Sequence, residues 1–210
     1  MIRMPDPPHF DPDGGFLCHS VHWRPNPDDP DPEMPGQKVS MAGFIPVRPE
    51  DACLCGSGNT YRICCQPKRY WHPICLNPDA EGYSLLAPQS ARFHPVDGTA
   101  LRDRLTEDTR WVCVEDRPKK SFWIFWGDPA LEDPYGILCF GDLEIKQNRT
   151  LLVTAMSDLR MRILLQSLKE IFGDRLGVPE ITHDQAEVVG KWDKANTRKR
   201  GRKLRIGRRK

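Results

Sequence analysis

The sequence predicts an α+β protein, in which a mainly antiparallel sheet carries one long packed helix. Two pairs of short runs rich in β-branched and aromatic residues, each pair joined by a polar turn, indicate two β-hairpins. The second pair leads into a segment with apolar residues at three- and four-residue spacing, which is typical of an amphipathic helix. A small cysteine-rich module precedes these elements, and an acidic and a basic segment flank them.

The overall composition excludes several classes of protein. Of the 210 residues, 39% are hydrophobic, and the 20 prolines and 16 glycines are too few for a wholly disordered chain. No apolar run approaches the roughly 20 residues of a transmembrane helix, and the first residues lack the apolar core of a signal peptide. We therefore expect a cytoplasmic protein, in which the eight cysteines bind metal or are buried rather than form disulfides.

The N-terminal part of the chain is acidic and rich in proline. Residues 1–52 carry a net charge of −5, and eleven of the 20 prolines fall in residues 1–50. Proline fixes φ and removes a backbone donor, so proline repeats resist helix and central-strand formation. We expect a disordered acidic arm over residues 1–50. Two apolar pieces within it, residues 16–23 and 41–47, are the best candidates to dock on the body.

The C-terminal end has the opposite charge. Residues 191–210 contain eleven Lys or Arg and one Asp, a net charge of +10, whereas residues 1–190 carry −8. Like charges at this density repel one another, so we expect a disordered basic tail over residues 191–210. Arginine binds phosphate through paired hydrogen bonds, which favours contact with a nucleic-acid backbone. The candidate contacts are the nine basic residues nearest the end: Arg198, Lys199, Arg200, Arg202, Lys203, Arg205, Arg208, Arg209 and Lys210.

The foldable body begins with a short helix, expected around residues 99–106. The runs WVCVE (residues 111–115) and SFWIFW (residues 121–126) follow it and predict the first hairpin. Residues 137–146 and 150–156 predict the second hairpin. Apolar and charged residues alternate in the LEIK part of this segment, which is the period of a strand buried on one face. We expect these four strands to form the sheet.

A long helix follows the second hairpin. Ser157 is a favourable N-cap, Asp158 suits the positive end of the helix dipole, and Gly173 is a suitable stop. The strands and this helix are expected to make up a domain over residues 91–190. One face of the helix is apolar and is expected to pack on the sheet: Met161, Leu164, Leu165, Leu168, Ile171 and Phe172.

Four cysteines within thirteen residues form the clearest candidate site, in the pattern C-x-C-x8-C-C: Cys53, Cys55, Cys64 and Cys65. Tetrahedral Zn²⁺ takes four nitrogen or sulfur ligands. Gly56 and Gly58 permit the unusual φ values that the loop needs in order to return to the ion. A site closed by four thiolates is typical of structural rather than catalytic zinc. We expect one structural Zn²⁺ in a small knuckle module over residues 51–90.

This run resembles the SEC-C motif, a zinc module found at the C-terminus of the bacterial preprotein translocase ATPase and in many other bacterial proteins. The resemblance implies that the four cysteines bind zinc. Family members often carry basic residues after the glycine turn, where this chain has Asn59 and Thr60. Residues 141–176 resemble, more weakly, a hairpin-plus-helix module that accompanies SEC-C motifs. The family pattern C-x-C-G-S-G-x-x-Y-x-x-C-[CH] is matched at Cys53, Cys55, Gly56, Ser57, Gly58, Tyr61, Cys64 and Cys65.

Other cysteines and histidines are weaker candidates. A second zinc site is one hypothesis, and packing or exposure to solvent is the competing interpretation. Its ligands would come from two short clusters: Cys18, His19 and His22, and His72 and Cys75. Cys113 and Cys139 fall within expected strands, so they are interpreted as small buried residues.

We expect a zinc-binding adaptor without enzymatic activity. Its basic tail would contact nucleic acid, RNA rather than DNA, or a ribonucleoprotein, and its zinc module would contact protein partners. A further hypothesis is that the acidic arm folds over the tail and masks it until a polyanion competes. The alternative is a metal-dependent, nuclease-like enzyme with carboxylates at strand ends: Asp128, Glu132, Asp133 and Asp142.

Overall fold

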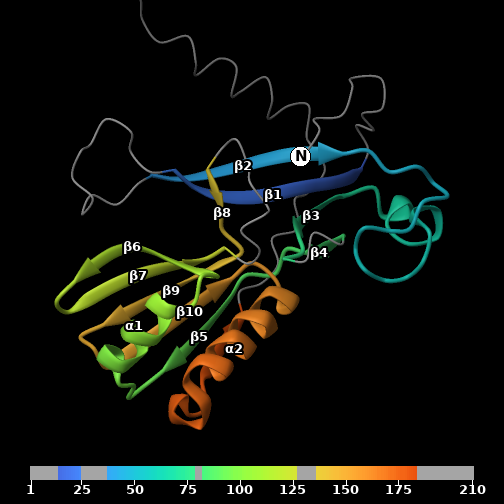
Figure 1. Ribbon diagram of the computed structural model, residues 1–210. Helices are drawn as coiled ribbons and strands as arrows, with labels where there is room; N and C mark the ends of the chain where they lie inside the picture. The colour runs from blue at the N-terminus through green and yellow to red at the C-terminus, as the bar shows by residue number, and fades with distance from the viewer. Residues whose placement is uncertain (1–13, 25–36, 79–81, 127–135, 184–210) are drawn as a thin grey trace, which may run out of the picture.

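The computed structural model describes residues 14–24, 37–78, 82–126 and 136–183, which form two β-sheets and two α-helices (Figure 1). The first sheet has five strands, in the order β2-β1-β3-β4, with β8 also paired to β1. Its strands are β1 (Gly15–Arg24), β2 (Gln37–Ile45), β3 (Trp71–Leu76), β4 (Tyr83–Leu85) and β8 (Ile137–Leu138).

The second sheet has six strands, all paired antiparallel, in the order β11-β5-β10-β9-β7-β6. Both hairpins that the sequence predicts are present, as β6–β7 and β9–β10. The sheet also contains β5 and β11, which the sequence analysis missed because both are short and β11 is exposed along its whole length. Its strands are β5 (Gln89–Phe93), β6 (Trp111–Arg117), β7 (Lys120–Phe125), β9 (Gly141–Lys146), β10 (Thr150–Ala155) and β11 (Glu180–His183).

Two helices, α1 (Gly98–Glu107) and α2 (Asp158–Phe172), cover one face of the second sheet (Figure 1). Their apolar side chains share one core with the strands, in which Leu101, Leu164 and Val153 are fully buried. This confirms the α+β prediction of a mainly antiparallel sheet with one long packed helix. No helix among the described residues is long and apolar enough to cross a membrane.

Both ends of α2 lie where the sequence predicts. The Ser157 hydroxyl accepts a hydrogen bond from the backbone N–H of Arg160 at 3.2 Å and so caps the first turn. Gly173 ends the helix with a φ of +64°, in the left-handed region that glycine adopts without strain. These local signals explain why this element could be predicted residue by residue.

The ordered part of the acidic arm is larger than the sequence predicts. Its two apolar pieces, residues 16–23 and 41–47, fall largely within β1 and β2. These strands pair antiparallel over nine residues, and the other edge of β1 pairs in parallel with β3. The prolines and acidic residues between β1 and β2 lie outside the described residues, as does the whole basic tail.

The chain crosses between the two sheets at Cys139 and Phe140. The sequence predicts one strand over residues 137–146, but the structure has β8 in the first sheet and β9 in the second. The backbone N–H of Cys139 donates to Val21 of β1 at 2.8 Å, whereas that of Phe140 donates to Phe125 of β7 at 3.0 Å. Consecutive amides therefore bond to different sheets, and this junction joins them.

Candidate metal centre

The candidate metal centre lies in the connection between β2 and β3. Its first two cysteines enter a tight turn, which Cys53 closes by donating its backbone N–H to Asn59 at 2.8 Å. Gly56 and Gly58 have φ values of +77° and +75°, as the sequence analysis expected. A Cβ built at either glycine meets nothing within 4 Å. Glycine is therefore required here by backbone conformation rather than by space.

The other two cysteines, Cys64 and Cys65, lie between two short 3-10 helices, η2 (Tyr61–Ile63) and η3 (Gln66–Lys68). All four Sγ atoms lie within 4.8 Å of one another. The Sγ atom of Cys64 is 3.5 Å from that of Cys55 and 3.8 Å from that of Cys65. A Zn–S distance of about 2.3 Å places the sulfurs of a tetrahedral site about 3.8 Å apart. The cluster therefore has the dimensions of a four-thiolate site for one ion.

Residues 51–67 match the family model described as SEC-C motif. The chain carries a SEC-C motif. No curated protein and no solved structure matches the chain. We call residues 51–67 the SEC-C module. The family match and the four clustered thiols together support metal binding by this module.

The thiols of the SEC-C module differ in their affinity for protons. Burial raises the pKa values of Cys53 and Cys65. Burial acts in the same direction at Cys55, but hydrogen bonds from Ser57 and Cys53 outweigh it and lower the pKa of Cys55 to about 6. Four thiolates at this spacing would repel one another strongly. A divalent cation that replaces the thiol protons removes that repulsion, so the site favours a bound metal ion.

Two polar side chains contact the sulfur atoms: Ser57 within the SEC-C module and Lys68 directly after it. The Oγ atom of Ser57 lies 3.2 Å from the Sγ of Cys64, and the Nζ of Lys68 lies 4.0 Å from the Sγ of Cys65. Four thiolates around a divalent ion carry a net charge of −2, which these donors partly offset. From the sequence, Ser57 is only a matched position of the SEC-C pattern, and Lys68 has no predicted role. The available signal was the position of Lys68, one 3-10 turn after Cys65.

The SEC-C module is packed on the first sheet. The side chains of Cys53, Tyr61 and Cys65 are buried together with Phe16 of β1 and Ile74 of β3. The ring centroids of Phe16 and Tyr61 are 5.6 Å apart, with the rings tilted. An aromatic pair of this kind adds to the free energy gained by burial. The module therefore shares a core with strands on both sides of it in the sequence.

The residues considered for a second zinc site lie on two paired strands, with Cys18 of β1 opposite Ile74 of β3. They do not form a metal site: within the described ranges, the SEC-C cysteines are the only group of three or more potential ligands that could hold one ion. The Nε2 atom of His22 lies 2.8 Å from the Oγ of Ser20. Burial raises the pKa of Cys18 to about 11, so this thiol is protonated at neutral pH.

The carboxylates of the nuclease-like alternative do not form a described cluster. Asp142 lies on β9, where its Oδ2 atom is 3.0 Å from the Nζ of Lys38, and its Oδ1 atom accepts a hydrogen bond from Thr154. Its partners are thus a cation and a hydroxyl rather than a second carboxylate. The other three carboxylates lie outside the described residues: Asp128, Glu132 and Asp133.

The two cysteines interpreted as buried differ in the structure. Cys139 is buried at the junction of the two sheets, as expected. Cys113 lies on β6 as predicted, but its side chain is exposed. Cys113 pairs with Trp123 of β7, whose side chain is buried, but β6 is the outermost strand of its sheet and so has a neighbouring strand on one side only. The exposure of Cys113 could not be predicted because the order of strands in a sheet depends on pairing between distant segments.

Proposed function

We propose that this chain is a zinc-binding adaptor without enzymatic activity that acts in the cytoplasm. The supporting observation is the closed set of four thiols in the SEC-C module. Four thiolates complete the tetrahedral coordination of Zn²⁺ and leave no open position for water or substrate. Soft thiolate ligands also favour Zn²⁺ over Mg²⁺ or Ca²⁺. The ion would then stabilise the loop and its two short helices.

Metal analysis tests the zinc assignment. The full chain, purified without chelator, should contain one zinc per chain by elemental mass spectrometry. The variant Cys64→Ser should lose the ion, because it removes one of four ligands. The matched variant Cys113→Ser, which alters an exposed thiol on β6, should retain it. A wild-type chain that holds no metal, or a different metal, would contradict the proposal.

We propose that the SEC-C module also binds a protein partner. Ile63, at the end of η2, exposes 69% of its surface and follows the exposed Arg62. A large apolar side chain that is exposed on a loop held by metal and by packing is suited to the centre of an interface.

Affinity capture from cells tests this contact. Tagged chains carrying Ile63→Ser should lose a partner that wild type retains after nuclease treatment. The control is Val178→Ser, which removes a 94% exposed apolar side chain outside the module. Loss of the same partner from both variants would show that the effect does not depend on the module.

The basic tail, residues 191–210, is the proposed contact with nucleic acid, RNA rather than DNA, or with a ribonucleoprotein. Its net charge of +10 supports this, since phosphate neutralisation by Lys and Arg releases counterions. Arg-rich segments commonly fold on RNA, and their affinity depends little on base sequence. The SEC-C module and the tail would then connect a protein to a polyanion.

Binding to labelled RNA and DNA tests the tail. The comparison is between the full chain and a chain of equal length in which Gln replaces each Lys and Arg of residues 198–210. We expect wild-type affinity to fall about a thousandfold between low and physiological salt, as for six or more phosphate contacts. The Gln-substituted chain should bind weakly at all salt concentrations. Equal binding by the two chains would exclude the tail as the contact.

A further inference from the structure

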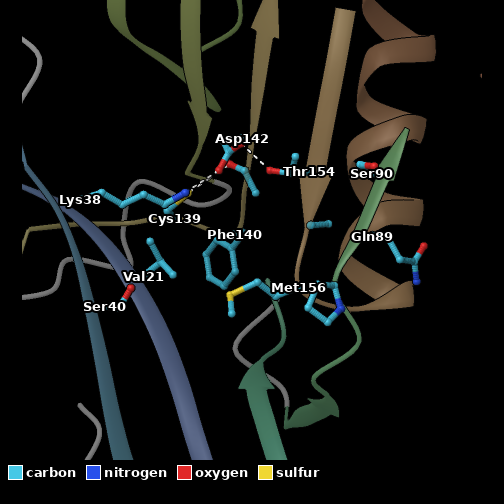
Figure 2. A pocket seen from close by; sticks show the side chains of 13 residues that line it. Val21, Lys38, Ser40, Gln89, Ser90, Cys139, Phe140, Asp142, Thr154 and Met156 are labelled. Atoms are coloured by element: carbon cyan, nitrogen blue, oxygen red, sulfur yellow. Dashed lines mark hydrogen bonds and ion pairs between the residues drawn. The ribbon is translucent and has the colours of Figure 1, made fainter. Parts of the chain in front are cut away.

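A cleft of about 330 Å³ lies at the junction of the two sheets (Figure 2). One wall comes from β1 and β2 of the first sheet, and the other from β5, β9 and β10 of the second. Cavities that bind small molecules range upward from about 300 Å³, so the cleft has room for one small ligand. It is separate in the chain from both the SEC-C module and the basic tail.

Polar side chains form a row on the wall that belongs to the second sheet. Asp142 of β9 pairs with Thr154 of β10, and Thr154 pairs with Ser90 of β5. Residues paired across antiparallel strands project to the same face, and this is the face opposite the one that α1 and α2 cover. Lys38 reaches across from β2 and meets the end of this row at Asp142 (Figure 2).

The ion pair of Lys38 and Asp142 retains unused hydrogen-bonding capacity. The ammonium group has three N–H donors, of which one faces Asp142, and the carboxylate offers about four acceptor positions. One oxygen of the Asp142 carboxylate accepts a hydrogen bond from Lys38, and the other accepts one from the hydroxyl of Thr154. The side chain of Lys38 remains 48% exposed, so solvent or a ligand can approach it. Attraction to Asp142 outweighs the effect of burial and raises the pKa of Lys38, which therefore stays charged.

Apolar side chains complete the cleft beside this ion pair. Met156 lies below it in Figure 2 and is partly exposed, and Val21 lies on the side of the first sheet. The side chain of Phe140, further below, is fully buried in the core of the second sheet. A ligand suited to this cleft therefore has an apolar part and two adjacent charges of opposite sign. The pair of charges in the cleft sums to zero, so neither a simple anion nor a simple cation is favoured.

We propose that this cleft binds a free α-amino acid with an apolar side chain. The carboxylate of the ligand binds Lys38, its ammonium group binds Asp142, and its side chain contacts Val21 and Met156. An α-amino acid carries its two charges on neighbouring carbon atoms, which matches two protein charges only 3.0 Å apart. Each protein charge keeps an oppositely charged partner in the complex, which lowers the cost of desolvation.

Calorimetric titration of the full chain with L-leucine, L-methionine and L-phenylalanine tests the site. At least one should bind with a millimolar or lower Kd and raise the midpoint of thermal unfolding. N-acetyl-L-leucine lacks the ammonium charge, and L-leucinamide lacks the carboxylate. Each should bind at least about tenfold more weakly than L-leucine, because a charged hydrogen bond is lost. Equal affinity for the blocked forms would overturn the recognition of both charges.

Two variants locate the binding. Asp142→Asn and Lys38→Met should each weaken amino-acid binding at least about tenfold. The matched control is Glu144→Gln, which alters the ion pair of Glu144 and Lys146 (2.9 Å) on the same strand but outside the cleft. Circular dichroism establishes whether each variant is folded. If Asp142→Asn does not fold, Lys38→Met alone locates the binding. Absence of binding to all three amino acids, or unchanged affinity in a folded variant, would overturn the proposal.

Discussion

The guanidinium group of Arg160 donates two hydrogen bonds to the backbone carbonyl of Leu76, at 2.6 Å from Nη2 and 3.0 Å from Nε. Arg160 belongs to α2 and Leu76 ends β3, so this contact ties the helix on the second sheet to the first sheet. The Arg160 side chain is fully buried, and its guanidinium lies 5.0 Å from the centre of the Phe140 ring. A buried cation is tolerated here because carbonyl oxygens and a ring face satisfy it.

Replacement of Arg160 by Met should therefore destabilise the protein by about 1–3 kcal/mol, since it leaves the Leu76 carbonyl without its buried donors. Urea unfolding monitored by tryptophan fluorescence measures this change. Arg162→Met, which removes an exposed charge from the same helix, should change the free energy of unfolding by less than about 0.5 kcal/mol. Similar effects of the two substitutions would contradict a specific role for Arg160.

Substitution of Gly56 tests the left-handed turn of the SEC-C module. Its φ of +77° makes Gly56→Val costly, by about 1–2 kcal/mol or more, because a β-branched residue rarely adopts this region. Gly56→Asn should cost less, since asparagine tolerates the left-handed region. Competition with a zinc chelator should show weaker zinc retention for Val than for Asn. The reverse order would show that the backbone conformation is not what selects glycine.

The contact between Gly141 and α2 leaves no space for a side chain. A Cβ built at Gly141 comes to 2.8 Å from the carbonyl oxygen of Thr154 and also overlaps the Leu164 side chain. Gly141→Ala should destabilise the protein by about 1–3 kcal/mol through overpacking. A double-mutant cycle with Leu164→Ala should give a favourable coupling energy, because the smaller side chain relieves part of the overlap. If the free-energy changes of the two substitutions add strictly, the overlap with Leu164 contributes nothing, and the strain lies at the Thr154 carbonyl alone.

Acid should remove a stabilising contact at the end of α1. Hydrogen bonds from Arg110, at 3.1 Å from Nε and 2.7 Å from Nη2, hold the pKa of Asp108 below its ordinary value of 3.8. The folded state thus binds the proton less readily than the unfolded state. The contribution is full above about pH 5, and it is lost as the pH falls through the unfolded-state pKa and then through the lowered pKa of the folded state.

The contribution of the pair of Asp108 and Arg110 to the free energy of unfolding should be less than about 1 kcal/mol, because Arg110 is partly exposed and solvent screens the pair. Asp108→Asn should therefore lower stability at neutral pH and flatten its dependence on pH in the acidic range. Unfolding by urea at several pH values measures both effects. Asp103→Asn, at an exposed position of α1, provides the comparison. A wild-type pH dependence in Asp108→Asn would contradict this assignment.

Masking of the tail by the acidic arm can be tested without deleting the arm. Removal of residues 1–50 would also remove β1 and β2, which form part of the first sheet. Conversion of the acidic residues between these strands to amides keeps both strands: Asp28, Asp29, Asp31 and Glu33. If the arm masks the tail, nucleic-acid affinity should rise at low salt, where charges interact most strongly. Unchanged affinity would exclude masking by this segment.

Local sequence determined the SEC-C module and the centre of the second sheet. The four cysteines and the glycine turn lie within thirteen residues, so their spacing alone predicted the thiol cluster. Both hairpins and α2 were predictable for the same reason, because turn residues, Ser157 and Gly173 act on neighbours close in the chain. Such features depend on propensities that a short segment carries with it.

Only the tertiary structure decided how distant segments meet. The parallel pairing of β1 with β3, the switch of sheets at Cys139, and the contact between Lys38 and Asp142 each join residues with no mutual signal in the sequence. Lys38 and Asp142 lie 104 positions apart and come together because β2 and β9 border one cleft. Contacts of this kind depend on the packing of whole sheets, since a single strand pattern is compatible with several partners. The thiol cluster is therefore a property of the sequence, and the cleft is a property of the fold.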